Sequence, residues 1–212
     1  MNDSYRTLVA GEIAQAEFVD RKSRFIAQLT HVGSEAEAQE FLAQVRARHY
    51  DARHNVPAWI LADGTERASD DGEPQRTSGM PTLEVLRGVG LRDVCCVVTR
   101  YFGGTLLGPG GLVRAYSTAT QRAVDVACEQ GLVVEMTLVT PVEARVPYAL
   151  FERVRDMARR AGAHERSCAY AEDVTLCLAF RAGEEAAFVD ELRELASGAD
   201  LCEVGEPAFD EF

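Results

Sequence analysis

The sequence predicts an α+β protein built from two domains. Strand-like segments of alternating polarity are interspersed with amphipathic helical segments throughout the chain. Gly131 ends a long helical segment, and a second series of elements starts there. From residue 132 to 206 the expected order is strand, helix, strand, strand, helix, strand, which is the split βαβ pattern of a ferredoxin-like domain. We therefore expect one domain at residues 1–131 and a second at residues 132–212.

Several elements of the first domain are indicated by local signals. Ser34 is a suitable N-cap, because Glu35 and Glu37 follow it in the first turn of a helix. The apolar run at 94–98 predicts a central strand that is buried on both faces. The predicted strands span 11–19, 23–32, 56–62 and 93–102, and the predicted helices span 34–49, 81–90 and 112–130. A long polar segment at 63–81 and a glycine-rich loop at 103–111 connect them.

The second domain follows the split βαβ order in detail. Its predicted strands span 132–146, 163–171, 173–180 and 201–204, and its predicted helices span 147–161 and 183–196. Residues 206–212 have the composition of a frayed acidic tail.

Composition favours a cytoplasmic, globular protein. Of the 212 residues, 47% are hydrophobic and 26% are charged, which is typical of a folded soluble domain. No apolar run is long enough to span a bilayer, and the N-terminal segment lacks the residue order of a signal peptide. The six cysteines contain no Cys-x-x-Cys pair, so neither a zinc ribbon nor a thioredoxin-type site is indicated.

Charge is distributed unevenly between the two predicted domains. Residues 1–131 hold 14 Arg and Lys against 17 Asp and Glu, a net charge of −3. Residues 132–212 hold 8 against 17, a net charge of −9. Because the second domain repels a polyanion, any contact with nucleic acid is expected in the first.

The glycine-rich loop is the first candidate for a binding site. It follows a buried strand and opens a helix, where glycines expose backbone N–H groups and the helix N-terminus favours an anion. Its sequence matches neither a Walker A motif nor the Rossmann fingerprint. The alternative is a sharp strand-to-helix turn that requires small residues. The candidate binding residues are Arg100, Tyr101, Gly103, Gly104, Gly108, Gly110, Gly111 and Arg114.

The acidic segment is the second candidate, with Ser69, Asp70, Asp71 and Glu73 as its polar residues. Its carboxylates could hold Mg²⁺ or act as acid and base. The alternative, a solvated acidic turn, is favoured over a metal site, and we expect neither a metal nor a cofactor. Clustered carboxylates gain from a nearby guanidinium, so they are expected to lie close to Arg100 or Arg114.

No catalytic constellation is visible in the sequence. The chain contains neither a His-Glu-x-x-His motif nor a Gly-x-Ser-x-Gly elbow. His54 and Asn55, at the start of a predicted strand, are expected to be structural hydrogen-bonding residues. We therefore assign no catalytic residue and favour a protein that is not an enzyme.

Several of these segments resemble the IMPACT family, in its bacterial YigZ-like branch. The resemblance is carried by residues 67–74, 99–104 and 107–116, with further matches at 22–27 and at His54-Asn55. It implies that the first domain has the fold of the second domain of ribosomal protein S-five. It also implies a ferredoxin-like second domain similar to one in elongation factor G. The family usually carries lysine at position 106 and arginine at position 80, where this chain has Leu106 and Met80.

The resemblance also implies a function connected with translation. Eukaryotic relatives regulate translation by competing for the activator of a starvation-responsive initiation-factor kinase. The expected function is therefore a non-catalytic, translation-associated binding or regulatory protein, with RNA, the ribosome or a translation factor as its partner at the first domain. Two alternatives remain open. One is an enzyme that acts on a phosphorylated small molecule with Mg²⁺ at the acidic segment, and the other is a protein-interaction module that uses the acidic second domain.

Overall fold

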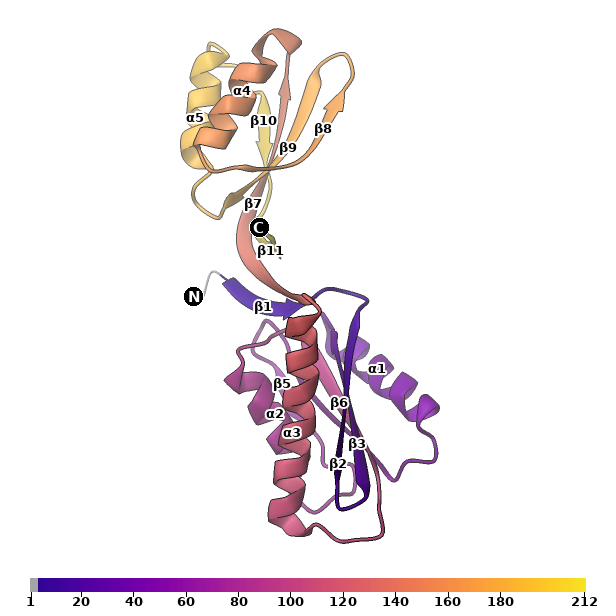
Figure 1. Cartoon of the computed structure of the whole chain (residues 1–212). Coiled ribbons are helices and arrows are strands. Elements are labelled where there is room, and N and C mark those ends of the chain that lie inside the picture. The colour runs from indigo at the N-terminus through magenta and orange to yellow at the C-terminus, as the bar shows by residue number, and fades with distance from the viewer. Residues whose placement is uncertain (1–3) are drawn as a thin grey trace. The chain divides into compact units, whose positions relative to one another are not determined.

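The computed structural model describes residues 4–212 and divides them into two compact units (Figure 1). The N-terminal unit comprises Tyr5–Val134, and the C-terminal unit comprises Glu135–Phe212 together with Ser4. Both units combine helices with β-sheet, so the predicted α+β class is confirmed. Within the described part of the chain, no helix is long and apolar enough to cross a membrane.

The N-terminal unit is built on an antiparallel sheet of five strands in the order β2-β3-β6-β4-β5. These strands are β2 (Ile13–Asp20), β3 (Ser23–His31), β6 (Val94–Tyr101), β4 (His54–Ile60) and β5 (Glu66–Ala68). The short strand β5 was not predicted from the sequence. A further strand that was not predicted, β1 (Ser4–Leu8), comes before β2 in the chain. β1 places Leu8 in the core and forms a parallel bridge between Arg6 and Leu91.

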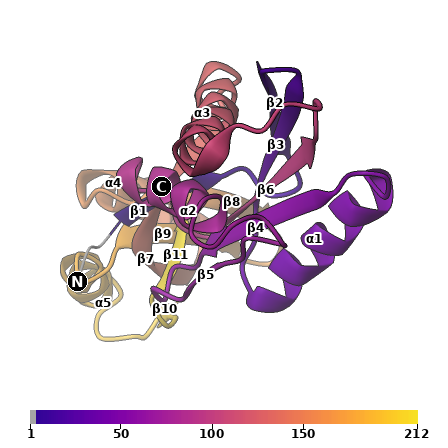
Figure 2. The same ribbon diagram turned by 90° about the horizontal axis from the view of Figure 1, so that it is seen from below.

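Helices cover both faces of this sheet. Helix α1 (Glu35–Arg48) lies on one face, and α2 (Gly79–Gly88) and α3 (Gly108–Glu129) lie on the other (Figure 2). The central strand β6 contributes side chains to the hydrophobic cores on both faces of the sheet. Cys95 and Val97 pack with residues of α1, whereas the residues that alternate with them along the strand pack with residues of α2 and α3. The prediction of a strand buried on both faces is therefore confirmed.

Helix boundaries agree with the sequence where a capping signal is present. Ser34 caps α1 as expected, and its side chain accepts a hydrogen bond from the Glu37 amide. Helix α3 begins at Gly108, earlier than the predicted residue 112. Pro109 occupies its first turn, where the fixed φ of proline suits a helix and the missing N–H costs no hydrogen bond.

Gly103 lies where the connection from β6 to α3 crosses the β2–β3 turn. A Cβ atom built on Gly103 would lie 2.0 Å from the carbonyl carbon of Lys22 and 2.3 Å from the amide nitrogen of Ser23. The Gly103 amide donates a hydrogen bond to Ser23 Oγ at 3.2 Å. Only glycine fits at this crossing, so Gly103 has a packing requirement of its own.

The C-terminal unit has the predicted order of elements. It contains β7 (Val133–Val146), α4 (Tyr148–Arg160), β8 (His164–Tyr170), β9 (Val174–Arg181), α5 (Ala186–Leu195) and β10 (Cys202–Val204). The strands pair antiparallel in the order β10-β7-β9-β8, so β9 separates β7 from β8 as in a split βαβ arrangement. Side chains of α4 and α5, including Phe151 and Phe188, pack with Leu176 in one core.

The expectation of a frayed C-terminal tail is wrong. Strand β11 (Ala208–Glu211) pairs antiparallel with β7, with Ala208 opposite Val139 and Glu211 opposite Met136. The Phe212 ring stacks on His164 with their centroids 3.9 Å apart. Strand pairing and ring stacking outweigh the acidic composition, which alone indicates disorder.

We predict that Gly103→Ala lowers the free energy of unfolding by about 1–3 kcal/mol, because the added methyl group overlaps the backbone of the β2–β3 turn. Chemical denaturation followed by circular dichroism measures this loss. Gly88→Ala is the matched control, since its added methyl group would meet no atom within 4 Å. It should change stability by less than about 1 kcal/mol. Equal losses in both variants would contradict the steric explanation.

A second prediction concerns the independence of the two units. Trp59, the single tryptophan, is buried in the core beneath α1, so its fluorescence reports on the N-terminal unit alone. Leu176→Ala removes a fully buried side chain from the C-terminal core and should destabilise that unit by about 2–5 kcal/mol. If the units fold separately, circular dichroism of the variant will show a transition at a lower denaturant concentration than in the unmodified protein. The unfolding transition followed by Trp59 fluorescence will keep its midpoint. A parallel shift of both transitions would show that the chain unfolds as one domain.

Candidate functional site

A cleft opens in the N-terminal unit beside the start of α3. Its volume is about 360 Å³, and we refer to it as the Arg100 cleft. Side chains from the start of β4, the acidic segment, the end of β6 and the glycine-rich connection meet there. The lining residues are Arg53, His54, Gly72, Glu73, Pro74, Arg100, Phe102, Leu106, Leu107, Gly108, Pro109 and Leu112.

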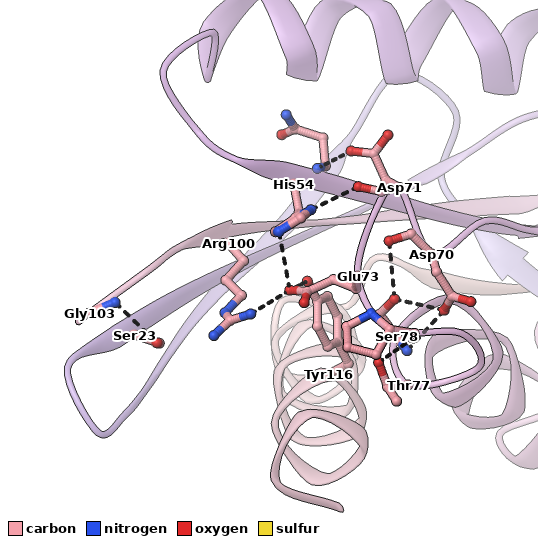
Figure 3. Close-up of polar contacts among 12 residues, drawn as sticks. Ser23, His54, Asp70, Asp71, Glu73, Thr77, Ser78, Arg100, Gly103 and Tyr116 are labelled. Atoms are coloured by element: carbon pink, nitrogen blue, oxygen red, sulfur yellow. Dashed lines mark hydrogen bonds and ion pairs between the residues drawn. The ribbon is translucent and has the colours of Figure 1, made fainter. Parts of the chain in front are cut away.

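A buried ion pair joins Glu73 and Arg100, two residues of the cleft lining (Figure 3). Glu73 Oε1 accepts hydrogen bonds from Arg100 Nη1 at 2.6 Å and from the Tyr116 hydroxyl at 2.9 Å. His54 Nε2 lies 3.9 Å from the same oxygen. Burial and the negative charge of Glu73 both raise the pKa of Tyr116, which therefore stays a hydrogen-bond donor. The expected contact with Arg100 is confirmed for Glu73 but not for Asp70 and Asp71, which bind other groups.

The Arg100 guanidinium is only partly satisfied by these contacts. Its side chain is 7% exposed, and the rings of Phe25 and Phe102 lie 5.5 and 5.6 Å from its central carbon. Nη1 is bonded to Glu73, whereas Nε is buried with no hydrogen-bond partner among residues 4–212. A buried donor without a partner costs free energy, so a hydrogen-bond acceptor placed at Nε would be favourable.

Asp70 is used as a cap for α2. Its Oδ1 accepts hydrogen bonds from the amides of Ser78 and Gly79 and from the Ser78 hydroxyl, and its Oδ2 accepts one from the Arg76 amide. Burial raises the pKa of the Asp70 carboxyl, but these hydrogen bonds outweigh burial and leave the pKa below its ordinary value. Both oxygens are therefore committed to the segment that leads into α2, and Figure 3 shows the bonds between Asp70 and Ser78.

Asp71 points in a different direction. Its Oδ1 forms an ion pair with Arg46 at 2.6 Å, and its Oδ2 accepts a hydrogen bond from the backbone amide of Asn55 at 2.6 Å. Its carbonyl oxygen accepts a hydrogen bond from His54 Nδ1, and its amide donates to Ser69 Oγ. The hydrogen bonds of His54 and Asn55 agree with the structural role expected for them.

The acidic segment therefore does not form a metal site in this geometry. Its three carboxylates diverge to an ion pair in the cleft, to the start of α2 and to Arg46. Among the residues that the structure describes, no group of three His, Cys, Asp or Glu side chains is placed to hold a metal ion. The donor set does not fit Mg²⁺, which requires several oxygens around one point.

Two of the predicted site residues lie outside the cleft. Tyr101 projects from the opposite face of the sheet to Arg100, and its hydroxyl donates to Asp51 at 3.1 Å and lies 3.0 Å from His49 Nδ1. Tyr101 is separated from Arg100, because neighbouring residues of a strand face opposite sides of the sheet. Arg114 is exposed on α3 and forms no ion pair with the acidic segment within the described chain.

The glycines of the connection have distinct roles. Gly104 and Gly108 adopt positive φ angles of 85° and 73°, which favour glycine. Gly108, Gly110 and Gly111 belong to the first turn of α3 rather than to a loop. This helix has no side-chain cap and no acidic residue in its first turn, and open space lies above Gly110. Its first N–H groups are therefore available to an external acceptor.

Sequence reasoning missed several residues of the cleft. Arg53 is exposed at its rim, and Phe102 and Leu106 contribute apolar surface to its wall. His54 reaches the site because it pairs with Arg100 across β4 and β6. Cross-strand register is the signal that would have found His54, and register depends on the assembled sheet.

Two protein-family models match separate parts of the chain. The Impact N-terminal domain matches residues 21–124, a range that contains every residue lining the Arg100 cleft. A domain of unknown function, DUF1949, matches residues 145–199 in the C-terminal unit.

Two similar proteins and one solved structure cover most of the chain. YvyE of Bacillus subtilis, an IMPACT family member, is 36% identical over 92% of this chain and 89% of its own length. A family member from Haemophilus influenzae is 35% identical over 88% of this chain and 92% of its own length, and YigZ of Escherichia coli is 45% identical over 49% of this chain. The crystal structure of a hypothetical protein covers 96% of this chain with a TM-score of 0.64 and 30% identity. Because similarity at this level extends over both units, the protein belongs to the IMPACT family.

Proposed function

We propose that this IMPACT-family protein is a non-catalytic, translation-associated binding protein whose N-terminal unit contacts RNA. The family resemblance implies a role in the regulation of translation, and the Impact N-terminal domain is the part that carries the Arg100 cleft. Such a contact would be made at the ribosome or together with translation factors.

This proposal rests on a difference between the acidic and the basic side chains of the N-terminal unit. The carboxylates of Asp70, Asp71 and Glu73 are all engaged in internal contacts. Arg53 and Arg114 are exposed and form no ion pair within residues 4–212. Free arginines beside an uncapped helix N-terminus are suited to phosphate contacts, although the net charge of the whole chain is −12.

The two alternatives receive less support from the geometry. A magnesium-dependent enzyme would need converging carboxylates, and those of the acidic segment diverge. A protein-interaction role for the acidic C-terminal unit makes no use of the Arg100 cleft. It remains the function to consider if RNA does not bind.

We further propose that the two units have the folds that the family resemblance implies, namely the second domain of ribosomal protein S-five and a ferredoxin-like domain. The antiparallel order β10-β7-β9-β8 with both helices on one face supports the second assignment (Figure 1).

We expect modest, salt-sensitive binding of a fluorescently labelled single-stranded RNA to the intact protein. Because few phosphate contacts are available, the logarithm of the affinity should fall against the logarithm of salt concentration with a slope of about −2 to −4. The double variant Arg53→Gln/Arg114→Gln should lower affinity at least about tenfold and make the slope shallower, because it removes two phosphate contacts. Fluorescence anisotropy at several salt concentrations measures both quantities.

The matched control is Arg153→Gln/Arg159→Gln, which removes two exposed arginines from α4 of the C-terminal unit. It changes the net charge by the same amount and should leave RNA affinity nearly unchanged. A loss as large in this control as in the first variant would assign the effect to net charge alone. No binding at low salt would refute the RNA contact and favour the protein-interaction alternative.

A further inference from the structure

The unpaired edge of Arg100 is the first part of a second binding site. Glu73 occupies Nη1, and Nε is buried with no hydrogen-bond partner among the described residues. Nε and the neighbouring Nη2 form the side of a guanidinium that takes an oxyanion with two parallel hydrogen bonds. Glu73 and the two flanking phenylalanine rings hold the guanidinium in place, so this edge is oriented before any ligand arrives.

The start of α3 supplies a further donor to the same cleft. Gly108 and Pro109 line the cavity, and the helix that they open has 22 residues and no side-chain cap. The first N–H groups of such a helix carry partial positive charge and lack internal partners. Pro109 has no N–H, so the donor is the amide of Gly108. Arg53 adds an unpaired full charge at the rim.

Part of the wall of the cleft is apolar. Phe102 is 45% exposed and Leu106 is 80% exposed, and both line the cavity. The cavity of about 360 Å³ falls within the range of about 300–1000 Å³ that is common for small-molecule sites. A ligand that filled the cleft would place a charged group on the donors and a flat apolar body against Phe102.

We propose that the Arg100 cleft binds a phosphate monoester carried by a flat aromatic group, as in a nucleoside 5′-monophosphate. A monoester has three terminal oxygens, which can meet the Arg100 edge, the helix N-terminus and Arg53 together. A carboxylate or an internal phosphodiester offers only two free oxygens and a single charge. The same chemistry is found in a free mononucleotide and at the 5′-phosphorylated end of an RNA.

Isothermal titration calorimetry with the intact protein tests this assignment. The probes are adenosine 5′-monophosphate, adenosine and inorganic phosphate, together with one RNA sequence carrying either a 5′-phosphate or a 5′-hydroxyl. The monophosphate should bind at least about tenfold more tightly than adenosine, because adenosine lacks the charged hydrogen bonds, and inorganic phosphate should compete with it. No binding of the monophosphate at about 1 mM, or equal binding of adenosine, would overturn the proposal.

Two variants locate the binding in the cleft. Arg53→Gln removes the charge at the rim of the cleft and should weaken binding of the monophosphate at least about tenfold. Arg100→Lys keeps a cation for Glu73 but loses the Nε–Nη2 edge, and should weaken binding to a similar extent. Arg153→Gln, which removes an exposed arginine of the C-terminal unit, should bind like the unmodified protein. Trp59 fluorescence and circular dichroism show whether each variant is folded. A folded Arg53→Gln protein with unchanged affinity would overturn the proposal.

The RNA probes identify the source of the phosphate. Tighter binding of the 5′-phosphorylated RNA, displaced by the free monophosphate, would assign the cleft to RNA ends. Binding of the monophosphate without any effect of the RNA 5′-phosphate would assign it to a free nucleotide. The second result supports the cleft even if RNA binding fails altogether, so this inference and the proposed RNA contact can be refuted separately.

Discussion

The buried ion pair between Arg100 and Glu73 is the interaction on which the N-terminal site depends. It joins the central strand β6 to the acidic segment and, through Tyr116, to α3. Such a pair adds little net stability, because both charges lose their hydration when they are buried. Removal of one partner is far more costly, about 3–5 kcal/mol, since the other charge is then left uncompensated. The pair therefore specifies one arrangement of three elements rather than adding much stability to it.

The acidic segment shows how a run of carboxylates can be structural. Asp70 binds the start of α2, Asp71 binds Arg46 and the β4 backbone, and Glu73 binds Arg100. Each of the three carboxylates has a different partner, and these favourable contacts offset the repulsion between the adjacent negative charges. The part of this segment that lines the Arg100 cleft is Gly72, Glu73 and Pro74.

The sequence was informative where a local signal determined the structure. Ser34 defined a helix start, the apolar run 94–98 defined the central strand, and the order of elements in the C-terminal unit followed from periodicity. Strands β1 and β11 were missed because their partners are remote in sequence and their own patterns are short and polar. The site was recovered in part. Electrostatics anticipated the contact between Arg100 and the acidic segment, whereas Arg53 and Phe102 depended on how the ends of three segments meet.

The chain position of β6 has a consequence for how the protein is made. The strand lies at the centre of the sheet, yet it follows the other four strands of that sheet in the sequence. The hairpin of β2 and β3 and the hairpin of β4 and β5 share no hydrogen-bonded edge until β6 is placed between them. During synthesis, the first half of the N-terminal unit therefore emerges as two separate hairpins with open edges. Closure of the sheet must wait until about a hundred residues have been released, so the interval before β6 emerges is the period of greatest exposure to aggregation and to chaperones.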